Sequence, residues 1–241
     1  MPEEGARAEH AHRGDKPFIM QADGTGWLYA PAGLTDGPFP THYEPEESPF
    51  DNPLYGQRSS PARERFPRRE NPYNPSSASS GHPGSWVFPH VFTTYRLTEH
   101  PTAGGMSRTV EHLSELQPEM FCEVSPELAE EVGLENGGWA TIVTTRTAIE
   151  ARVLVTDRLA PLKVQGQEIN LVGLPYRWGS KGLAKGDPAN NLLGLALNPN
   201  VHIGEYKAST CDIRPGRRPR GHALVEFVEG YHRRAQNGGR P

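Results

Sequence analysis

The sequence predicts a small, mainly β barrel with short helices, preceded by a long irregular segment. Three observations support this fold class. Short runs rich in β-branched and aromatic residues recur from residue 86 onward. Two brief helical patterns interrupt these runs, whereas residues 1–90 show little hydrophobic periodicity. Many short strands with only two helices are typical of a mixed barrel.

The predicted strands begin with "WVFPHVFTTYRLT", which starts at Trp86. "TIVTT" (141–145) follows two adjacent glycines, and "IEARVLVT" (149–156) alternates apolar and polar residues. That alternation places Ile149, Ala151, Val153 and Val155 on one face of a strand. Three more short runs complete the set of candidate strands: "INLVGLP", "STCDIR" and "ALVEFV".

The two predicted helices differ in how clearly their ends are marked. In "SRTVEHLSELQPEMF", apolar residues recur at helical spacing behind Ser107, a candidate N-cap. "SPELAEEVG" has Ser125 at the N-cap, Pro126 at the first helical position and Gly133 directly after the last turn. Both patterns predict helices of only two or three turns.

The chain divides into four segments by composition. It holds 26 Gly and 24 Pro, and proline restricts both its own backbone and the residue before it. We expect a disordered N-terminus at 1–15 and an extended, Pro- and aromatic-rich strap at 16–90. The barrel domain is predicted at 91–214, followed by a partly disordered C-terminal extension at 215–241. The aromatic residues of the strap favour a segment that lies against a larger surface.

Composition also excludes several classes of protein. A net charge of -4 and a pI near 6.2 give no global basic field for nucleic acid or anionic membranes. Two cysteines are too few for a disulfide framework, an Fe-S cluster or a Cys-rich zinc site. No run reaches the roughly 18 apolar residues of a membrane span, and the N-terminus has no secretory pattern. We therefore expect a cytoplasmic chain with no direct membrane insertion.

Three polar, glycine-rich segments lie between the predicted strands, at 95–109, 175–192 and 198–207. Glycine lets backbone N–H groups approach a ligand, and nearby Lys and Arg supply charge, so these segments suit a phosphate-bearing cofactor. Solvated loops are the alternative for each segment alone. The arginines after residue 213 favour a solvated loop over a nucleic-acid patch, because no aromatic residues are interleaved with them. The residues alone thus predict a β-rich binding module for an anionic ligand, without a catalytic or metal motif.

The sequence resembles a known family in several motifs. "KPFIMQADGTGWLYAPAGLTDGPFPTHYEPEESPFDNPL", "YRLTEH" and the run from Gln117 to Lys207 resemble the C-terminal portion of the large subunit of respiratory formate dehydrogenases. These enzymes belong to the dimethyl sulfoxide reductase superfamily. The resemblance covers residues 16 to about 214 and includes "LTEH", "PYRWG", "AN" and "EYK" in the family's order. It implies a double-psi β-barrel that binds a molybdopterin guanine dinucleotide.

The resemblance also implies particular cofactor-binding residues. "LTEH" and its continuation, the "WG" loop, "AN" and "EYK" place at the cofactor Thr98, His100, Gly105, Met106, Ser107, Trp178, Gly179, Asn190, Tyr206 and Lys207. "TAGGMS" departs from the formate dehydrogenase pattern, although a Met-Ser/Thr pair at this place is common in the wider superfamily. No catalytic residue and no metal ligand is implied within this chain.

The same resemblance implies that the catalytic apparatus lies elsewhere. In the family, the Fe-S segment and the metal ligand precede every motif present here, so we expect no Fe-S cluster in this chain and a Mo or W ion held by the missing part. The expected partners are the N-terminal portion of the large subunit and, through it, an Fe-S subunit. An exported complex would place the chain in the periplasm or at the membrane. The chain is then either a separate subunit or a truncated reading frame, and the alternative function is a non-catalytic barrel for cofactor handling or protein interaction.

Overall fold

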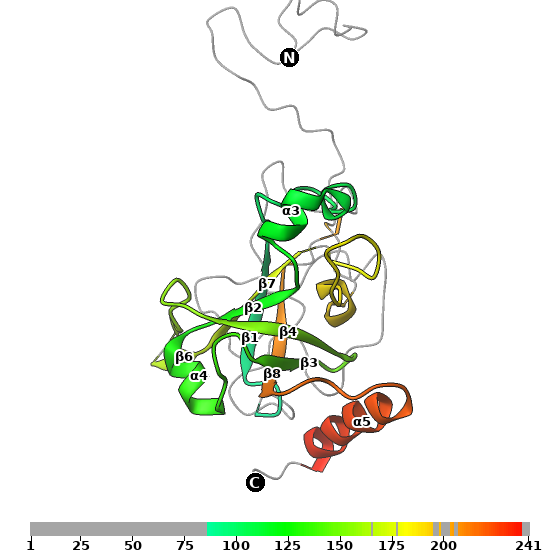
Figure 1. The fold of residues 1–241 in the computed structure, drawn as a ribbon. Helices are drawn as coiled ribbons and strands as arrows, with labels where there is room; N and C mark the ends of the chain where they lie inside the picture. Colours follow the sequence, from blue (N-terminus) through cyan, green and yellow to red (C-terminus); the bar gives the residue numbers. More distant parts are fainter. Residues whose placement is uncertain are drawn as a thin grey trace, which may run out of the picture.

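The computed structural model shows a barrel with a helix docked at one end (Figure 1). It describes residues 86–164, 166–176, 178–194, 198, 203–204 and 207–237. The predicted N-terminus and almost all of the predicted strap lie outside the described residues. The described part of the strap is its last few residues, which lead from Trp86 into the first strand of the barrel.

Six strands close the barrel in the order β1-β7-β2-β4-β3-β8. Their bounds are His90–Tyr95 for β1, Phe121–Val124 for β2, Trp139–Val143 for β3, Ala148–Val155 for β4, Leu171–Pro175 for β7 and Ala208–Pro215 for β8. The pairs β1–β7 and β2–β4 are parallel, and the other neighbours are antiparallel. A separate hairpin pairs β5 (Leu162–Val164) with β6 (Gln167–Ile169). This confirms the predicted fold class, a mainly β barrel with short helices.

The barrel interior holds the main hydrophobic core, which includes Phe92, Ile142, Leu174 and Ile213. In β4, three residues of the predicted inward face are buried, Ile149, Ala151 and Val153. Side chains that alternate along each strand fill such a closed barrel from all sides. The two cysteines, Cys122 and Cys211, lie in the same core and are free thiols, and burial raises the pKa of the Cys122 thiol to about 12.

Helix α4 (Pro126–Val132) begins and ends as the sequence predicts. The Ser125 side chain accepts a hydrogen bond from the N–H of Leu128 at 3.1 Å, and Gly133 ends the helix with φ 74°. The other predicted helix is shorter: a 3-10 turn η1 (Ser107–Thr109) precedes α3 (Glu111–Leu116). The prediction of Ser107 as the helix N-cap was wrong. The N-cap of α3 is Val110, and the Ser107 hydroxyl contacts His100 instead.

The C-terminal extension contains a helix, α5 (His222–Asn237), where the sequence predicted a strand at "ALVEFV". The strand prediction was wrong because the apolar positions continue at helical rather than alternating spacing beyond that run. Val228, Tyr231 and Ala235 form the buried stripe, and Phe88 and Val143 lie in the same cluster. The Tyr231 hydroxyl donates a hydrogen bond to Asp212 Oδ2 in β8 at 2.6 Å. The extension thereby docks against the barrel beside Phe88, close to the start of the described residues.

No helix among the described residues is long and apolar enough to cross a membrane. Within the same residues, no group of three or more His, Cys, Asp or Glu side chains could hold a metal ion.

We expect Tyr231→Phe to weaken the docking of α5. Burial and the neighbouring Asp212 raise the pKa of Tyr231, so its hydroxyl stays a protonated donor. Removing a hydrogen bond to a charged acceptor costs about 1.5–3 kcal/mol. Urea unfolding should show a loss of that size, whereas Val225→Ala, at an exposed position of the same helix, should change stability by less than about 0.5 kcal/mol. Equal effects of the two variants would contradict the docking role.

We expect His90 to make the fold less stable at acid pH. Burial holds the pKa of His90 below its ordinary value of 6.5, although Asp212 and Glu131 act in the opposite direction. Below pH 6.5 the unfolded chain therefore binds more protons than the folded one. The free energy of unfolding then decreases as the pH is lowered, by at most about 1.4 kcal/mol per pH unit. His90→Gln should flatten this slope in unfolding experiments at several pH values. The exposed His112→Gln should leave the slope unchanged.

Candidate functional site

The candidate site lies where two neighbouring strands end. Strands β1 and β7 run parallel, with Tyr95 in register with Pro175. Parallel strands end at the same edge of a sheet, so the polar segments that follow them begin side by side. Residues 96–109 and 176–192, which are far apart in the sequence, therefore share this edge of the barrel.

His100 contacts two other predicted site residues, Ser107 and Trp178. It is buried, with Nδ1 3.1 Å from the Ser107 hydroxyl oxygen and Nε2 2.9 Å from the carbonyl oxygen of Gln117. A carbonyl can only accept, so Nε2 carries a proton in this arrangement. Trp178 packs edge-on against the ring, with centroids 5.3 Å apart. Because both ring nitrogens have partners, His100 orients the loop and the indole ring around it.

Arg108 connects the two segments, and sequence reasoning missed it. Its side chain is buried, and Nη1 donates to the carbonyl oxygens of Gly179, Lys181 and Ala184. In return the Arg108 carbonyl accepts from the N–H groups of Leu183 at 2.7 Å and Ala184 at 3.3 Å. A single residue of the first segment thus fixes the backbone path of the second.

Gly182 permits this close approach. Its φ is +102°, and a Cβ atom there would lie 2.7 Å from the Arg108 carbonyl oxygen. L-residues rarely adopt such a φ, and real Cβ atoms do not come so close to an oxygen. Gly179, a predicted cofactor residue, has the Arg108 guanidinium as its near neighbour, at 3.5 Å from a hypothetical Cβ.

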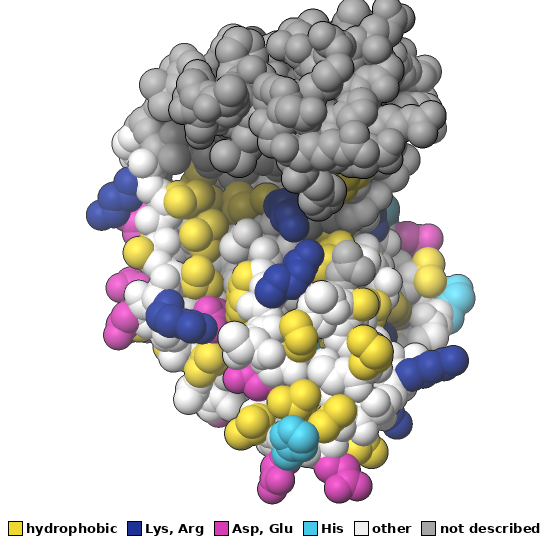
Figure 2. Space-filling model, turned by 90° about the horizontal axis from the view of Figure 1, so that it is seen from above, with side chains coloured by type: hydrophobic (Ala, Val, Ile, Leu, Met, Phe, Trp, Pro, Cys, Tyr) yellow, Lys and Arg dark blue, Asp and Glu magenta, His cyan; other side chains and the backbone are white. Residues whose placement is uncertain are grey.

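Four predicted residues face outward around this edge. Thr98, Gly105 and Met106 are exposed, and Asn190 is exposed in the 3-10 turn η2 (Ala189–Leu192). Met106 is 85% exposed and Leu183 is 61% exposed, so apolar side chains also border the site. Figure 2, which views the molecule from above Figure 1, shows exposed hydrophobic side chains among scattered Lys and Arg side chains. No contact among the described residues joins Asn190 to the group around His100.

Two cations flank Tyr176 at the same edge. The guanidinium of Arg96 lies 4.2 Å from the centre of the Tyr176 ring, and the ammonium of Lys207 lies 5.8 Å from it. Neither cation forms a salt bridge with a carboxylate among the described residues. Lys207 was predicted, whereas Arg96 was missed because it precedes "LTEH" within a predicted strand. Tyr206, also predicted, lies outside the described residues.

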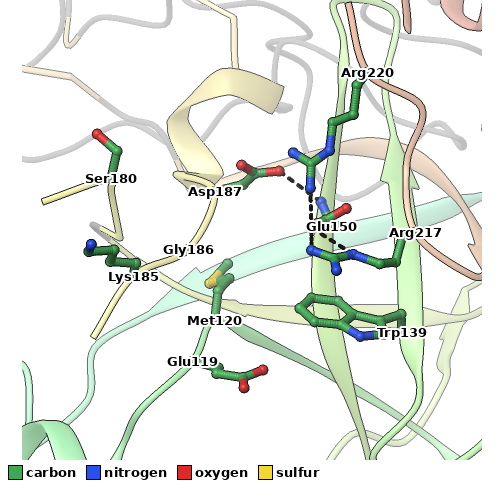
Figure 3. A pocket seen from close by; sticks show the side chains of 10 residues that line it. All are labelled: Glu119, Met120, Trp139, Glu150, Ser180, Lys185, Gly186, Asp187, Arg217 and Arg220. Atoms are coloured by element: carbon green, nitrogen blue, oxygen red, sulfur yellow. Dashed lines mark hydrogen bonds and ion pairs between the residues drawn. The ribbon is translucent and has the colours of Figure 1, made fainter. Parts of the chain in front are cut away.

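A cavity of about 370 Å³ lies beside the second segment, with Ser180, Lys185 and Gly186 among its lining residues. Figure 3 shows Arg217 and Arg220 directed toward Glu150 of β4. Each arginine places an Nη2 nitrogen 2.6 Å from Glu150 Oε1. Glu150 is buried. The alternation of this strand predicted an exposed side chain here, but Glu150 is buried like its neighbours Ile149 and Ala151.

Arg214 and the arginines of the C-terminal extension form ion pairs with carboxylates, although the side chains of Arg214, Arg217 and Arg220 remain exposed. Arg218 binds Asp187, and Arg214 binds Asp212 at 3.2 Å. Burial tends to raise the pKa of Asp187, but the hydrogen bonds from Arg218 and from the N–H of Glu150 outweigh it and hold that pKa below its ordinary value. The stretch predicted to be a solvated loop is mostly exposed, and its arginines also form ion pairs with carboxylates of the same chain.

The chain was compared with known proteins. Residues 91–210 match the family model of the molydopterin dinucleotide binding domain. "Formate dehydrogenase 2 subunit alpha (cytochrome c-553)" of Nitratidesulfovibrio vulgaris is 40% identical over 203 residues, which are 84% of this chain and 19% of that protein. "Formate dehydrogenase, nitrate-inducible, major subunit" of Escherichia coli is 40% identical over 199 residues, with 82% and 19% covered. The chain spans about one fifth of the length of these curated relatives.

Among solved structures, acetylene hydratase from Pelobacter acetylenicus is similar to the chain with a TM-score of 0.39 and 14% sequence identity. That similarity covers 54% of this chain and 19% of the acetylene hydratase chain.

We expect Gly182→Ala to disrupt the contact between the two segments, while Gly105→Ala is tolerated. The added methyl group at 182 meets the Arg108 carbonyl and forces a strained φ, at a cost of about 1–3 kcal/mol. At Gly105 no atom lies within 4 Å of a new Cβ. Urea unfolding of the two variants should show this difference, and hydrogen exchange should show faster exchange at Leu183 and Ala184 in Gly182→Ala alone. Similar stability of the two variants would contradict the contact.

Proposed function

The chain belongs, through residues 91–210, to the molybdopterin dinucleotide-binding domain family, and we propose that it binds a molybdopterin guanine dinucleotide at the edge where β1 and β7 end. One observation supports this location for the cofactor: two cations lie beside the Tyr176 ring. Arg96 directly follows β1 and Lys207 directly precedes β8, the antiparallel neighbour of β1, and both lie at one ring without carboxylate partners among the described residues. Such a pair is suited to the phosphates of a dinucleotide.

The residues at this edge fit the chemistry of the cofactor. Arg96 and Lys207 would hold negative charge, and Gly179 leaves room for a ligand close to the backbone. Trp178 is buried in the hydrophobic core and packs edge-on against His100, so it would support the site from beneath. Thr98, Gly105, Met106, Ser107 and Asn190 remain proposed contacts, with Ser107 placed by its hydrogen bond to His100. When bound, the metal-pterin group supplies the two-electron chemistry, and this chain supplies binding and orientation.

We further propose that the chain is the C-terminal part of a formate dehydrogenase large subunit. The reaction of the whole enzyme would convert formate to carbon dioxide, releasing a proton and two electrons. The relatives named as formate dehydrogenase subunits are about five times as long as the matched region. The partner is then the remaining N-terminal part of such a subunit, which would hold the Mo or W ion and pass electrons to an Fe-S subunit. The chain would act in whichever compartment holds that complex.

Cofactor binding can be tested on the full 241-residue chain. Cofactor released anaerobically from a purified relative is mixed with the chain, and pterin that elutes with the protein in gel filtration is measured by fluorescence after oxidation. Arg96→Gln combined with Lys207→Gln should weaken binding by about tenfold or more, because each removes a charge-assisted contact worth about 1.5–3 kcal/mol. Lys163→Gln, at an exposed position of the β5–β6 hairpin, is the matched control.

Two outcomes would contradict the proposal. A wild-type chain that elutes without pterin would exclude cofactor binding by this chain alone. Formate-dependent dye reduction by the purified chain alone would exclude its role as a non-catalytic part of the subunit.

A further inference from the structure

Arg218 of the C-terminal extension forms a bidentate ion pair with Asp187. Arg218 Nε lies 2.5 Å from Asp187 Oδ2, and Arg218 Nη2 lies 3.1 Å from Oδ1. The two side chains are only 16% and 21% exposed. A guanidinium that contacts both carboxylate oxygens fixes orientation as well as distance. Arg218 therefore sets where the Asp187 side chain points.

The same carboxylate is bound to the barrel wall. Asp187 Oδ2 accepts the N–H of Glu150 in β4 at 3.1 Å. Arg217 and Arg220, which flank Arg218 in sequence, both bind the Glu150 side chain. The segment after β8, the strand β4 and the Asp187 turn are thus joined in one network of charges (Figure 3).

This network lies directly before Asn190, a proposed cofactor contact. On one side, Gly186 packs so closely on Met120 that a Cβ at 186 would lie 2.3 Å from the Met120 Cβ. On the other side, Leu192 is fully buried, and its carbonyl accepts from the Thr144 hydroxyl at 3.1 Å. Asn190 itself stays exposed between these fixed points. Its position depends on the contacts of the turn, because its side chain forms no hydrogen bond with any of the described residues.

We propose that Arg218 is a positioning residue for the cofactor site: through Asp187 it fixes the turn that presents Asn190. This inference rests on the proposed binding of a molybdopterin dinucleotide. Arg218 belongs to the segment that leads into α5, whose buried stripe docks near Phe88 and Val143. Docking of the C-terminal extension and affinity for the cofactor are therefore coupled, and the extension acts on the ligand without touching it.

The test measures cofactor affinity and hydrogen exchange in the full chain. The probe is the released cofactor described above, and the variants are Arg218→Gln, Asp187→Asn and the two combined. Loss of a residue that positions a ligand-binding group typically weakens binding about 10- to 100-fold. We expect each single change to do so, the double change to weaken binding no further, and Arg218→Lys to restore part of the affinity. Amides of residues 186–192 should exchange faster in the same variants, at temperatures where all of them are folded.

The control is Arg233→Gln, which removes an exposed ion pair with Glu229 on α5 and should change neither affinity nor exchange. If the wild-type chain binds the cofactor and Arg218→Gln binds it equally well, the positioning role is wrong and the proposed function stands. If affinity falls additively in the double variant, the two residues act separately, which also overturns it. A wild-type chain that binds no cofactor overturns both proposals.

Discussion

The candidate site depends on one buried cation, Arg108. A guanidinium taken out of water needs several acceptors, and here these are three backbone carbonyl groups of one segment rather than a carboxylate. The arrangement works only if that segment curls around the side chain, which Gly182 allows through its left-handed φ. The positive charge is thus held at the base of the site by dipoles. No salt bridge among the described residues cancels its field, which favours an anionic ligand near this edge.

The barrel topology decides which segments can meet there. The parallel pairing of β1 and β7 brings the chain after Tyr95 next to the chain after Pro175, although eighty residues separate them in sequence. On the face of β7 opposite the core residues Val172 and Leu174, Gly173 keeps space for the Tyr95 ring and Leu159, since a Cβ there would lie 3.0 Å and 2.9 Å from their nearest atoms. A single-residue shift in this pairing would turn the inward side chains outward and separate His100 from Trp178.

The sequence predicted correctly those features that depend on interactions between residues close together in the chain. The caps of α4 and the alternation in β4 were readable because a hydrogen bond to a neighbouring residue, or a strand with one buried face, leaves a short pattern. Arg108 and Glu150 left none, because the partners of the Arg108 guanidinium and of the Glu150 carboxylate lie 67 to 76 positions away in the sequence. Helix α5 is a different case: "ALVEFV" alone has strand propensity, but the helical spacing of Val228, Tyr231 and Ala235 becomes visible only beyond that run.

The basic residues divide into two groups that composition cannot tell apart. Three arginines after β8 each form an ion pair with a carboxylate of the barrel or of the second segment: Arg217, Arg218 and Arg220. Arg96 and Lys207 lie near the Tyr176 ring instead, with no carboxylate partner among the described residues. For the three arginines the sequence favoured a solvated loop over a nucleic-acid patch, and it did not indicate their ion pairs with distant carboxylates. Arg96 and Lys207 lie next to strand ends as two isolated residues, which gave no cluster to detect.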